Sequence, residues 1–244
     1  MTNQKKWYQS WFNTPYYHLL YKNRDFHEAE GFIRNLVSYF NISLNKTILD
    51  LACGKGRHAI FLNALGYDVL GVDLSEHNIN EAKQSSTRNL DFRVHDMRHP
   101  LPLTFDVIFN LFTSFGYFEL PTDDQNVIAS IRQSLKKGGL GIIDFMNVDY
   151  VIQHLVPESF VHCNDVDFEI NRRFDGQSII KTIRVNDNGT QLDFEENVRA
   201  YRLEDFENML KTNGLRILDC FGNYDLEPFD KSSSKRLILA FTTK

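Results

Sequence analysis

The sequence has few of the features that mark specialised protein classes. Three of its 244 residues are cysteines, and the wide spacing of Cys53, Cys163 and Cys220 fits neither a zinc site nor a disulfide framework. No apolar run reaches the roughly 18 residues of a membrane-spanning helix. Lys5 and Lys6 precede no apolar stretch of the kind found in signal peptides. We therefore expect a cytoplasmic protein without membrane contact.

Basic residues are not in excess, and no cluster of metal ligands is apparent. The chain has 27 Lys and Arg against 32 Asp and Glu, a formal net charge of −5, which argues against a nucleic-acid partner because phosphate contacts need a basic face. His, Asp and Glu residues show no ligand spacing, so we expect no metal. The remaining composition, 42% hydrophobic and 24% charged, is that of one large globular domain or one domain with an insertion.

The most informative stretch is residues 47–58. It begins with an apolar run, 47–51, which is interrupted only by Asp50 and predicts a buried strand of a parallel sheet. Gly54 and Gly56 then predict a tight turn, and a helical pattern starts at Arg57. Glycine tolerates positive φ and has no Cβ to keep a ligand from the backbone. The amides that open the helix would face that ligand.

Two kinds of cofactor use such a turn. Gly54, Gly56 and Ala59 satisfy the G-x-G-x-x-G/A pattern of dinucleotide sites, which is a weak signal alone. The alternative is S-adenosylmethionine, which carries a sulfonium cation instead of a pyrophosphate. Asp50, four residues before Gly54, would repel a pyrophosphate and suits a cationic ligand.

Residues 50–56, Asp-Leu-Ala-Cys-Gly-Lys-Gly, resemble the first motif of the class I S-adenosylmethionine-dependent methyltransferases of the small-molecule type. Ala52 stands where the family usually has its first glycine. The resemblance covers about residues 47–145 well and the remainder loosely. It implies S-adenosylmethionine as cofactor, bound near Ala52, Cys53, Gly54 and Gly56. It also implies an α/β fold, a Rossmann-like, doubly wound, seven-stranded, mostly parallel sheet.

Acidic residues follow the next two predicted strands. Asp73 ends the strand predicted over 67–74 and lies 17 residues beyond Gly56, where nucleotide-binding folds place an acid for the ribose hydroxyls. The alternative is an exposed loop aspartate. Leu74, the next residue, is expected to contact the cofactor as well. Asp96 and Met97, after the strand predicted over 91–94, match the family positions that contact the adenine amino group and ring.

The strand predicted over 105–110 leads into an aromatic loop. Asn110 and Phe112 lie where strand ends form the ligand crevice of open α/β sheets, so we expect them to face cofactor and substrate. The loop lacks the Asn/Asp-Pro-Pro-aromatic motif of enzymes that methylate base amino groups. Its aromatic character predicts a dry pocket for a small organic substrate, although the rings could instead fill the core.

Residues 1–46 are predicted to be helical, with a helix start at Pro15 and a second helix over about 25–40. In small-molecule members of the resembling family, such a segment lies over the cofactor as a lid. Tyr17, Tyr21 and Arg24 are then candidates to contact the methionine end of the cofactor. The alternative is that these aromatics only pack an extra helical layer.

The second half of the chain departs from the minimal fold. A helix over 123–135 is predicted to end at the Lys-Lys-Gly-Gly of 136–139, before a strand over 140–145. Residues 146–202 predict a three-stranded antiparallel insertion, with strands over 160–174, 178–185 and 192–201. It is either a substrate cap or the contact of a possible homodimer. A helix over 203–213 and strands over 215–221 and 236–241 complete a methyltransferase domain made of 47–145 and 203–244.

The predicted reaction is methyl transfer to the N, O or C atom of a small molecule, driven mainly by positioning. His18 and Tyr117 are the candidate general bases. Other possibilities are a non-catalytic S-adenosylmethionine-binding protein, a methyltransferase of protein or RNA, and a nicotinamide-dependent oxidoreductase.

Overall fold

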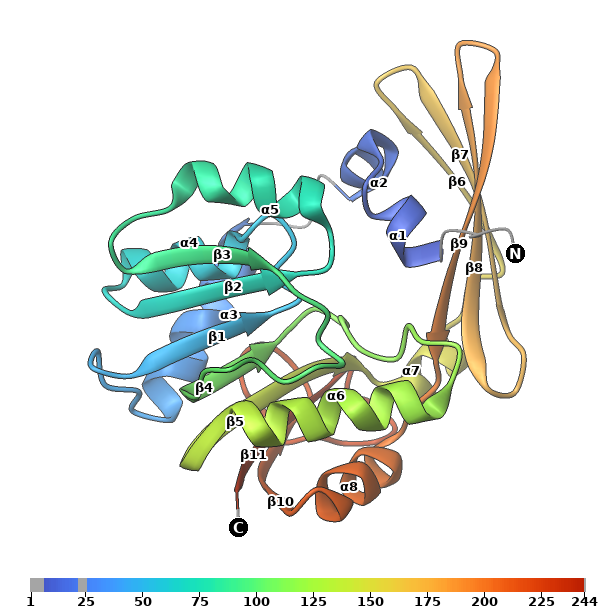
Figure 1. The fold of residues 1–244 in the computed structure, drawn as a ribbon. Helices are drawn as coiled ribbons and strands as arrows, with labels where there is room; N and C mark the ends of the chain where they lie inside the picture. The colour runs from blue at the N-terminus through green and yellow to red at the C-terminus, as the bar shows by residue number, and fades with distance from the viewer. Residues whose placement is uncertain (1–6, 22–25, 244) are drawn as a thin grey trace.

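The chain forms two separate sheets joined by helices (Figure 1). The computed structural model describes residues 7–21 and 26–243. The larger sheet has seven strands in the order β10-β11-β5-β4-β1-β2-β3. β11 is antiparallel to both of its neighbours, and the pairs among the other five adjacent strands are parallel. The strands are β1 (Thr47–Leu51), β2 (Asp68–Asp73), β3 (Leu90–Val94), β4 (Phe105–Asn110), β5 (Leu135–Met146), β10 (Leu215–Phe221) and β11 (Arg236–Thr243). This confirms the predicted seven-stranded, mostly parallel sheet.

Helices cover both faces of this sheet. On β4, Val107 and Phe109 pack into one core cluster, whereas Ile108 between them packs into the other. The first cluster includes residues of α3 (Phe26–Tyr39), α4 (Arg57–Ala64) and α5 (Glu76–Ala82); the second includes α6 (Pro121–Ser134) and α8 (Leu203–Thr212). The alternation follows from the two-residue period of a strand. Two short elements, η1 (Lys83–Ser85) and α7 (Val148–Gln153), complete the helices of this part.

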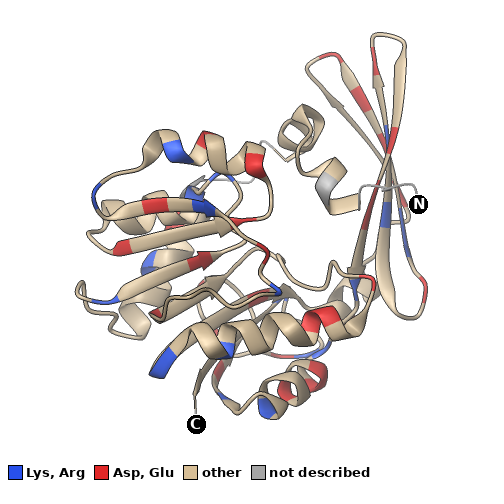
Figure 2. Ribbon diagram, viewed as in Figure 1, with Lys and Arg blue, Asp and Glu red and all other residues tan. Residues whose placement is uncertain are grey.

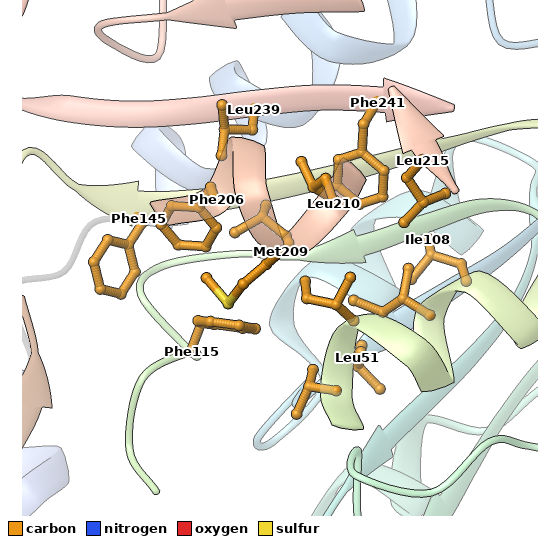
Figure 3. Packing of buried hydrophobic residues seen from close by; sticks show 14 of the residues in the cluster. Leu51, Ile108, Phe115, Phe145, Phe206, Met209, Leu210, Leu215, Leu239 and Phe241 are labelled. Atoms are coloured by element: carbon orange, nitrogen blue, oxygen red, sulfur yellow. The ribbon is translucent and has the colours of Figure 1, made fainter. Parts of the chain in front are cut away.

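The contact of α8 with the sheet illustrates this packing (Figure 3). Phe206, Met209 and Leu210 share one face of α8 and are buried against side chains such as Phe145 and Phe241. Burying side chains of this size contributes about 1.5–3 kcal/mol each, so this face attaches the C-terminal helix firmly to the sheet.

The smaller sheet has four antiparallel strands in chain order: β6 (Glu158–Cys163), β7 (Val166–Phe174), β8 (Ser178–Asp187) and β9 (Thr190–Arg199). The prediction of three strands is wrong, because residues 160–174 belong to two strands, β6 and β7, instead of one. The chain instead reverses at Asn164 and Asp165, whose φ values are 50° and 62°. Asn and Asp tolerate this left-handed conformation and so form a tight turn without glycine.

Two N-terminal helices, α1 (Trp7–Trp11) and α2 (Pro15–Leu20), lie between the two sheets (Figure 1). Trp11 is fully buried in a cluster with Phe168, Ile183 and Val185 of the smaller sheet. Thr14 caps α2 by accepting a hydrogen bond from the Tyr17 amide, which confirms the helix start predicted at Pro15.

The segment 136–139 belongs to β5 instead of ending a helix, which corrects a second prediction. α6 ends at Ser134, and β5 starts directly at Leu135. The register between β4 and β5 shifts between Phe105 and Val107, and Gly138 has φ +72°, as in a β-bulge. Within 7–21 and 26–243, no helix has the length and apolarity needed to cross a membrane.

Candidate functional site

A cavity of about 590 Å³ lies at the C-terminal ends of β1, β2, β3 and β4, against α1 and α2. This is the edge at which open α/β sheets bind ligands, and the volume is within the usual range for small-molecule sites. Most of the residues predicted from the sequence line it: Tyr17, His18, Tyr21, Ala52, Cys53, Gly54, Asp73, Leu74, Asp96, Met97, Phe112 and Tyr117.

Three predicted residues, Asp50, Gly56 and Asn110, do not line the cavity. Asp50 is 1% exposed, and its carboxylate accepts a hydrogen bond from the Ala59 amide at 3.1 Å. Burial raises the pKa of Asp50 to about 7. Asp50 therefore holds the start of α4 instead of facing a ligand. Asn110 is buried as well, and its side-chain amide donates to the Leu51 carbonyl at 3.0 Å. Arg24 lies outside the described residues.

Gly54 and Gly56 have different roles in the turn. A Cβ on Gly56, at φ +82°, would lie 2.5 Å from the Phe92 ring, so this glycine permits close packing beneath the turn. A Cβ on Gly54, at φ +56°, would meet nothing within 4 Å. Because Gly54 lines the cavity, its missing side chain leaves the backbone open to a ligand. Ala52 is also left-handed, with φ 64°.

Asp73 holds the turn and faces the cavity at the same time. Its Oδ2 accepts from the Gly54 amide at 2.9 Å, and its Oδ1 accepts from the Ser75 amide at 2.8 Å. Burial raises the pKa of Asp73 above its ordinary value. A carboxylate has about four lone-pair sites, so both oxygens can still accept hydrogen bonds from a ligand.

Asp96 is fixed at the edge of the cavity by Arg98. Arg98 donates to Asp96 Oδ2 at 2.6 Å and pairs with Asp123 at 3.1 Å. Partial burial acts to raise the pKa of Asp96, but the hydrogen bonds from Arg98 outweigh it, so the pKa is lowered. Asp96 is thus an ionised acceptor beside the apolar side chain of Met97.

Several buried polar atoms around the cavity have no protein partner. Among the described residues, the buried side-chain atoms without a hydrogen bond are Tyr8 OH, His18 Nε2, His58 Nε2, Asn78 Oδ1 and Asn110 Oδ1. All but Asn110 belong to residues that line the cavity. A buried polar atom without a partner costs about 1–3 kcal/mol, so these atoms favour a polar ligand. The residue pattern thus fits a nucleoside-type cofactor with amino and hydroxyl groups. Sequence reasoning missed Tyr8, His58 and Asn78, which belong to no motif.

Phe112 forms one wall of the cavity, and two residues at the start of α4 contact its ring. Its ring stacks on His58 with centroids 5.0 Å apart, and the Arg57 guanidinium lies 4.5 Å from the ring centroid. Burial lowers the pKa of His58 to about 3, so this ring is a neutral imidazole at neutral pH.

A buried ion pair supports the backbone of Phe112. Phe112 and Thr113 have φ values of 57° and 60°, a conformation that non-glycine residues rarely adopt. Asp144 is completely buried, accepts from the Phe112 amide at 2.8 Å and pairs with Arg236 at 2.7 Å. Tyr224 also donates to Asp144, at 3.3 Å. The sequence analysis did not identify Asp144, although its position near the end of β5 resembles those of the other strand-end acids.

A second cavity of about 450 Å³ adjoins the first. The two cavities share four aromatic residues, Phe12, Tyr17, Phe112 and Tyr117, and the second is otherwise lined largely by the smaller sheet and by Arg236 and Tyr224. Of the candidate bases, Tyr117 lines both cavities, whereas His18 lines the first. Burial and then Lys55 lower the pKa of His18, and Tyr117 donates its hydroxyl hydrogen bond to the Thr113 carbonyl. Within the described part of the chain, no three His, Cys, Asp or Glu side chains are grouped to hold a metal.

Known proteins resemble the chain in both sequence and structure. A family model described as a methyltransferase domain matches residues 48–139. YqeM of Bacillus subtilis (strain 168), described as a methyltransferase, is 30% identical over 203 residues, which are 78% of this chain and 81% of that protein. The dTDP-3-amino-3,4,6-trideoxy-alpha-D-glucopyranose N,N-dimethyltransferase of Streptomyces venezuelae is 30% identical over 101 residues, 40% of this chain and 41% of that protein.

The fold agrees with these matches. The crystal structure of an S-adenosylmethionine-dependent methyltransferase from Clostridium acetobutylicum aligns with a TM-score of 0.79 at 24% identity, covering 93% of this chain and 96% of that one. Three observations indicate the same family. They are the match to the methyltransferase domain model, the relative that aligns over most of its length, and the glycine turn beside Asp73. The chain belongs to the class I S-adenosylmethionine-dependent methyltransferases.

Proposed function

We propose that this methyltransferase transfers the methyl group of S-adenosylmethionine to an amine of a small molecule held in the second cavity. One observation carries the proposal: the two cavities meet at a shared wall of four aromatic residues. The second cavity has the volume of a site for a small organic molecule. A net charge of −5 is unfavourable for an RNA acceptor. The sugar N,N-dimethyltransferase among the relatives supports nitrogen over oxygen or carbon.

The first cavity provides groups that suit each part of the cofactor. The backbone at Ala52, Cys53 and Gly54 would lie against its amino-acid end, with Tyr17 and Tyr21 above it. Asp73 would accept the ribose hydroxyls, and Asp96 with Met97 would bind the adenine. When bound, S-adenosylmethionine supplies an electrophilic methyl group on a sulfonium.

The protein's contribution is then mainly to orient the acceptor and exclude water. Holding two reactants in a productive geometry can supply about 7–11 kcal/mol of a barrier. The shared aromatic wall excludes water from the junction of the cavities. A neutral amine attacks before its proton is lost, so an early general base is not required. Tyr117 is the better placed of the two candidates to accept that proton, because it lines both cavities.

In this proposal, residues 1–46 are a lid, 47–145 with 203–244 bind the cofactor, and 146–202 cap the acceptor. The small sheet supplies Arg172, Ile179, Lys181, Glu196 and Val198 to the second cavity, which supports the cap over a purely dimeric role. A homodimer remains compatible with this arrangement, and light scattering would measure it.

The test is to fill the second cavity selectively. Val198 lines it without lining the first, so Val198→Trp should leave S-adenosylmethionine affinity unchanged in calorimetry. The same variant should lower formation of S-adenosylhomocysteine from a mixture of small primary amines at least about tenfold. Phe160→Trp is the matched control, since Phe160 lies on the same sheet and is 62% exposed.

Four outcomes would contradict the proposal. Equal turnover by Val198→Trp and the control would place the acceptor elsewhere. Binding of S-adenosylmethionine without turnover on any amine, protein or RNA would indicate a non-catalytic binding protein. Turnover on RNA or protein alone would reject the small-molecule acceptor, and tight binding of NAD in place of S-adenosylmethionine would reject methyl transfer itself.

A further inference from the structure

The smaller sheet directs an unusual row of charges into the second cavity. The strand register places Arg172 on β7 opposite Lys181 on β8, and Lys181 opposite Glu196 on β9. All three side chains line the second cavity. Two cations therefore stand side by side with one anion. Like charges at directly opposed positions destabilise a sheet pair.

The other face of the same three strands carries a matched row. There the register places Glu169 opposite Arg184 and Arg184 opposite Asp193, so the charges alternate in sign. Arg184 pairs with Asp193 at 2.9 Å and with Glu169 at 3.9 Å. Both signs occur along the small sheet (Figure 2). The outward row is thus neutralised by its own neighbours, whereas the cavity row is not.

The anion of the cavity row is already engaged. Lys181 lies 3.5 Å from Glu196, and the two side chains are 13% and 17% exposed. Glu196 Oε1 also accepts from Trp11 Nε1 at 2.7 Å and from the Tyr21 hydroxyl at 2.6 Å. Lys181 additionally donates to the Tyr21 hydroxyl. Glu196 is thus committed to Lys181 and to the N-terminal helices.

Arg172 has no acidic partner in the described part of the chain. Its Nη1 donates to Ser159 Oγ at 2.9 Å and to the Val156 carbonyl at 3.4 Å, both neutral acceptors. The remaining N–H groups of the guanidinium form a planar fork that matches a carboxylate or phosphate. Arg236, the third cation of the lining, is paired with Asp144. Glu28, the other acid of the lining, lies on α3 instead of the small sheet, and its charge acts on Tyr224.

We propose that the second cavity recognises an acceptor that carries an anionic group, a carboxylate or a phosphate, and that Arg172 binds this group with Lys181 beside it. The proposal rests on the function proposed above. A bound anion would add a negative charge beside Arg172 and Lys181. It would thereby reduce the repulsion between these two cations. The anionic end of the acceptor would therefore lie against the small sheet. The acceptor would thus be a molecule with both an amine and an acidic group.

The experiment compares acceptors that differ by one anionic group. L-Phenylalanine is paired with phenethylamine for the carboxylate, and O-phosphoethanolamine with ethanolamine for the phosphate. Binding is measured by calorimetry on protein saturated with S-adenosylhomocysteine, for the wild type, Arg172→Gln, Arg172→Lys and Arg184→Gln. Arg184→Gln is the matched control, because it removes the same charge from the opposite face of the sheet.

In the wild type, the anionic member of at least one pair should bind about tenfold or more tightly than its partner. Arg172→Gln should remove that preference, Arg172→Lys should retain part of it, and Arg184→Gln should keep it. The pair that shows the preference identifies the carboxylate or the phosphate.

No preference in the wild type, including no binding of any anionic probe, overturns the proposal, as does an unchanged preference in Arg172→Gln. The affinity for S-adenosylmethionine is measured on the same samples and should be unchanged in Arg172→Gln, because Arg172 does not line the first cavity. Failure of cofactor binding or of turnover in the wild type would count against the proposed function, which separates the two results.

Discussion

The two sheets place their charged residues differently. In the seven-stranded sheet, both faces are covered, and the buried carboxylates Asp50 and Asp144 each hold a backbone amide of an adjoining loop or helix. In the four-stranded sheet, charged side chains stand in rows along both faces and mostly meet one another. The first sheet thus shapes a cavity through backbone turns at its strand ends. The second sheet shapes its cavity through side chains.

The largest expected effect tests the buried charge of the larger sheet. Asp144→Ala would leave Arg236 without its carboxylate in a buried site, so the free energy of unfolding should fall by about 3–5 kcal/mol in urea titrations. The control is Asp193→Ala, which breaks an exposed pair on the smaller sheet and should cost less than about 1 kcal/mol. Similar losses in both variants would remove the distinction between the sheets.

A second prediction concerns the pH dependence that Asp50 gives the ligand-free protein. Its pKa is raised from 3.8 to about 7, so the folded state binds more protons than the unfolded state between these pH values. The stability contributed by this proton is therefore full below pH 3.8 and is lost as the pH rises through about 7. Asp50→Asn cannot titrate, so it should be more stable than the wild type by about 2–4 kcal/mol at pH 8. Parallel stability profiles of the two proteins from pH 5 to 8 would disprove it.

The third prediction addresses the cofactor cavity. Asp73→Ala removes the acceptor of the Gly54 and Ser75 amides and the proposed ribose contact. S-Adenosylmethionine should bind at least about tenfold more weakly, about 1.4 kcal/mol, in calorimetry. Asp68→Ala changes an exposed carboxylate at the other end of β2 and should leave the affinity unchanged. Wild-type affinity in folded Asp73→Ala would exclude the assigned role.

The smallest expected effect tests the connection between the two parts. Tyr21→Phe removes the hydrogen bond from the C-cap residue of α2 to Glu196 and should lower the free energy of unfolding by about 1 kcal/mol. Tyr39→Phe, at a 50% exposed position, is the control. If Tyr21→Phe and Tyr39→Phe unfold at the same temperature, the hydrogen bond between Tyr21 and Glu196 contributes nothing to stability.

Sequence reasoning succeeded where a residue's role depends on near neighbours in the chain. The strand, glycine turn and helix of 47–64 form as predicted, and Asp73 and Asp96 follow their strands into the cavity. It failed at Asn164 and Asp165, which form a turn without glycine or proline inside the strand predicted over 160–174. It also failed at 136–139, where two glycines serve a bulge within β5 instead of a helix end.

Asp50 shows the limit of motif reasoning at one residue. The motif correctly located the carboxylate at the end of β1, but the side chain turns toward the Ala59 amide and is buried. Which way a side chain points depends on what packs around it. That packing comes from α4 and the neighbouring strands, and no local pattern contains it.

The amino-acid sequence alone determined the alternation of strands and helices over 47–110, the glycine turn and the acids at the strand ends, because periodicity, turn propensity and short spacings are local properties of the chain. Only the tertiary structure decided the composition of the second cavity. Its wall combines Phe12, Tyr117, Arg172, Glu196 and Arg236, which are far apart in the sequence. Their meeting depends on how two sheets and the N-terminal helices pack together, and such long-range contacts leave no local signature in the residues that make them.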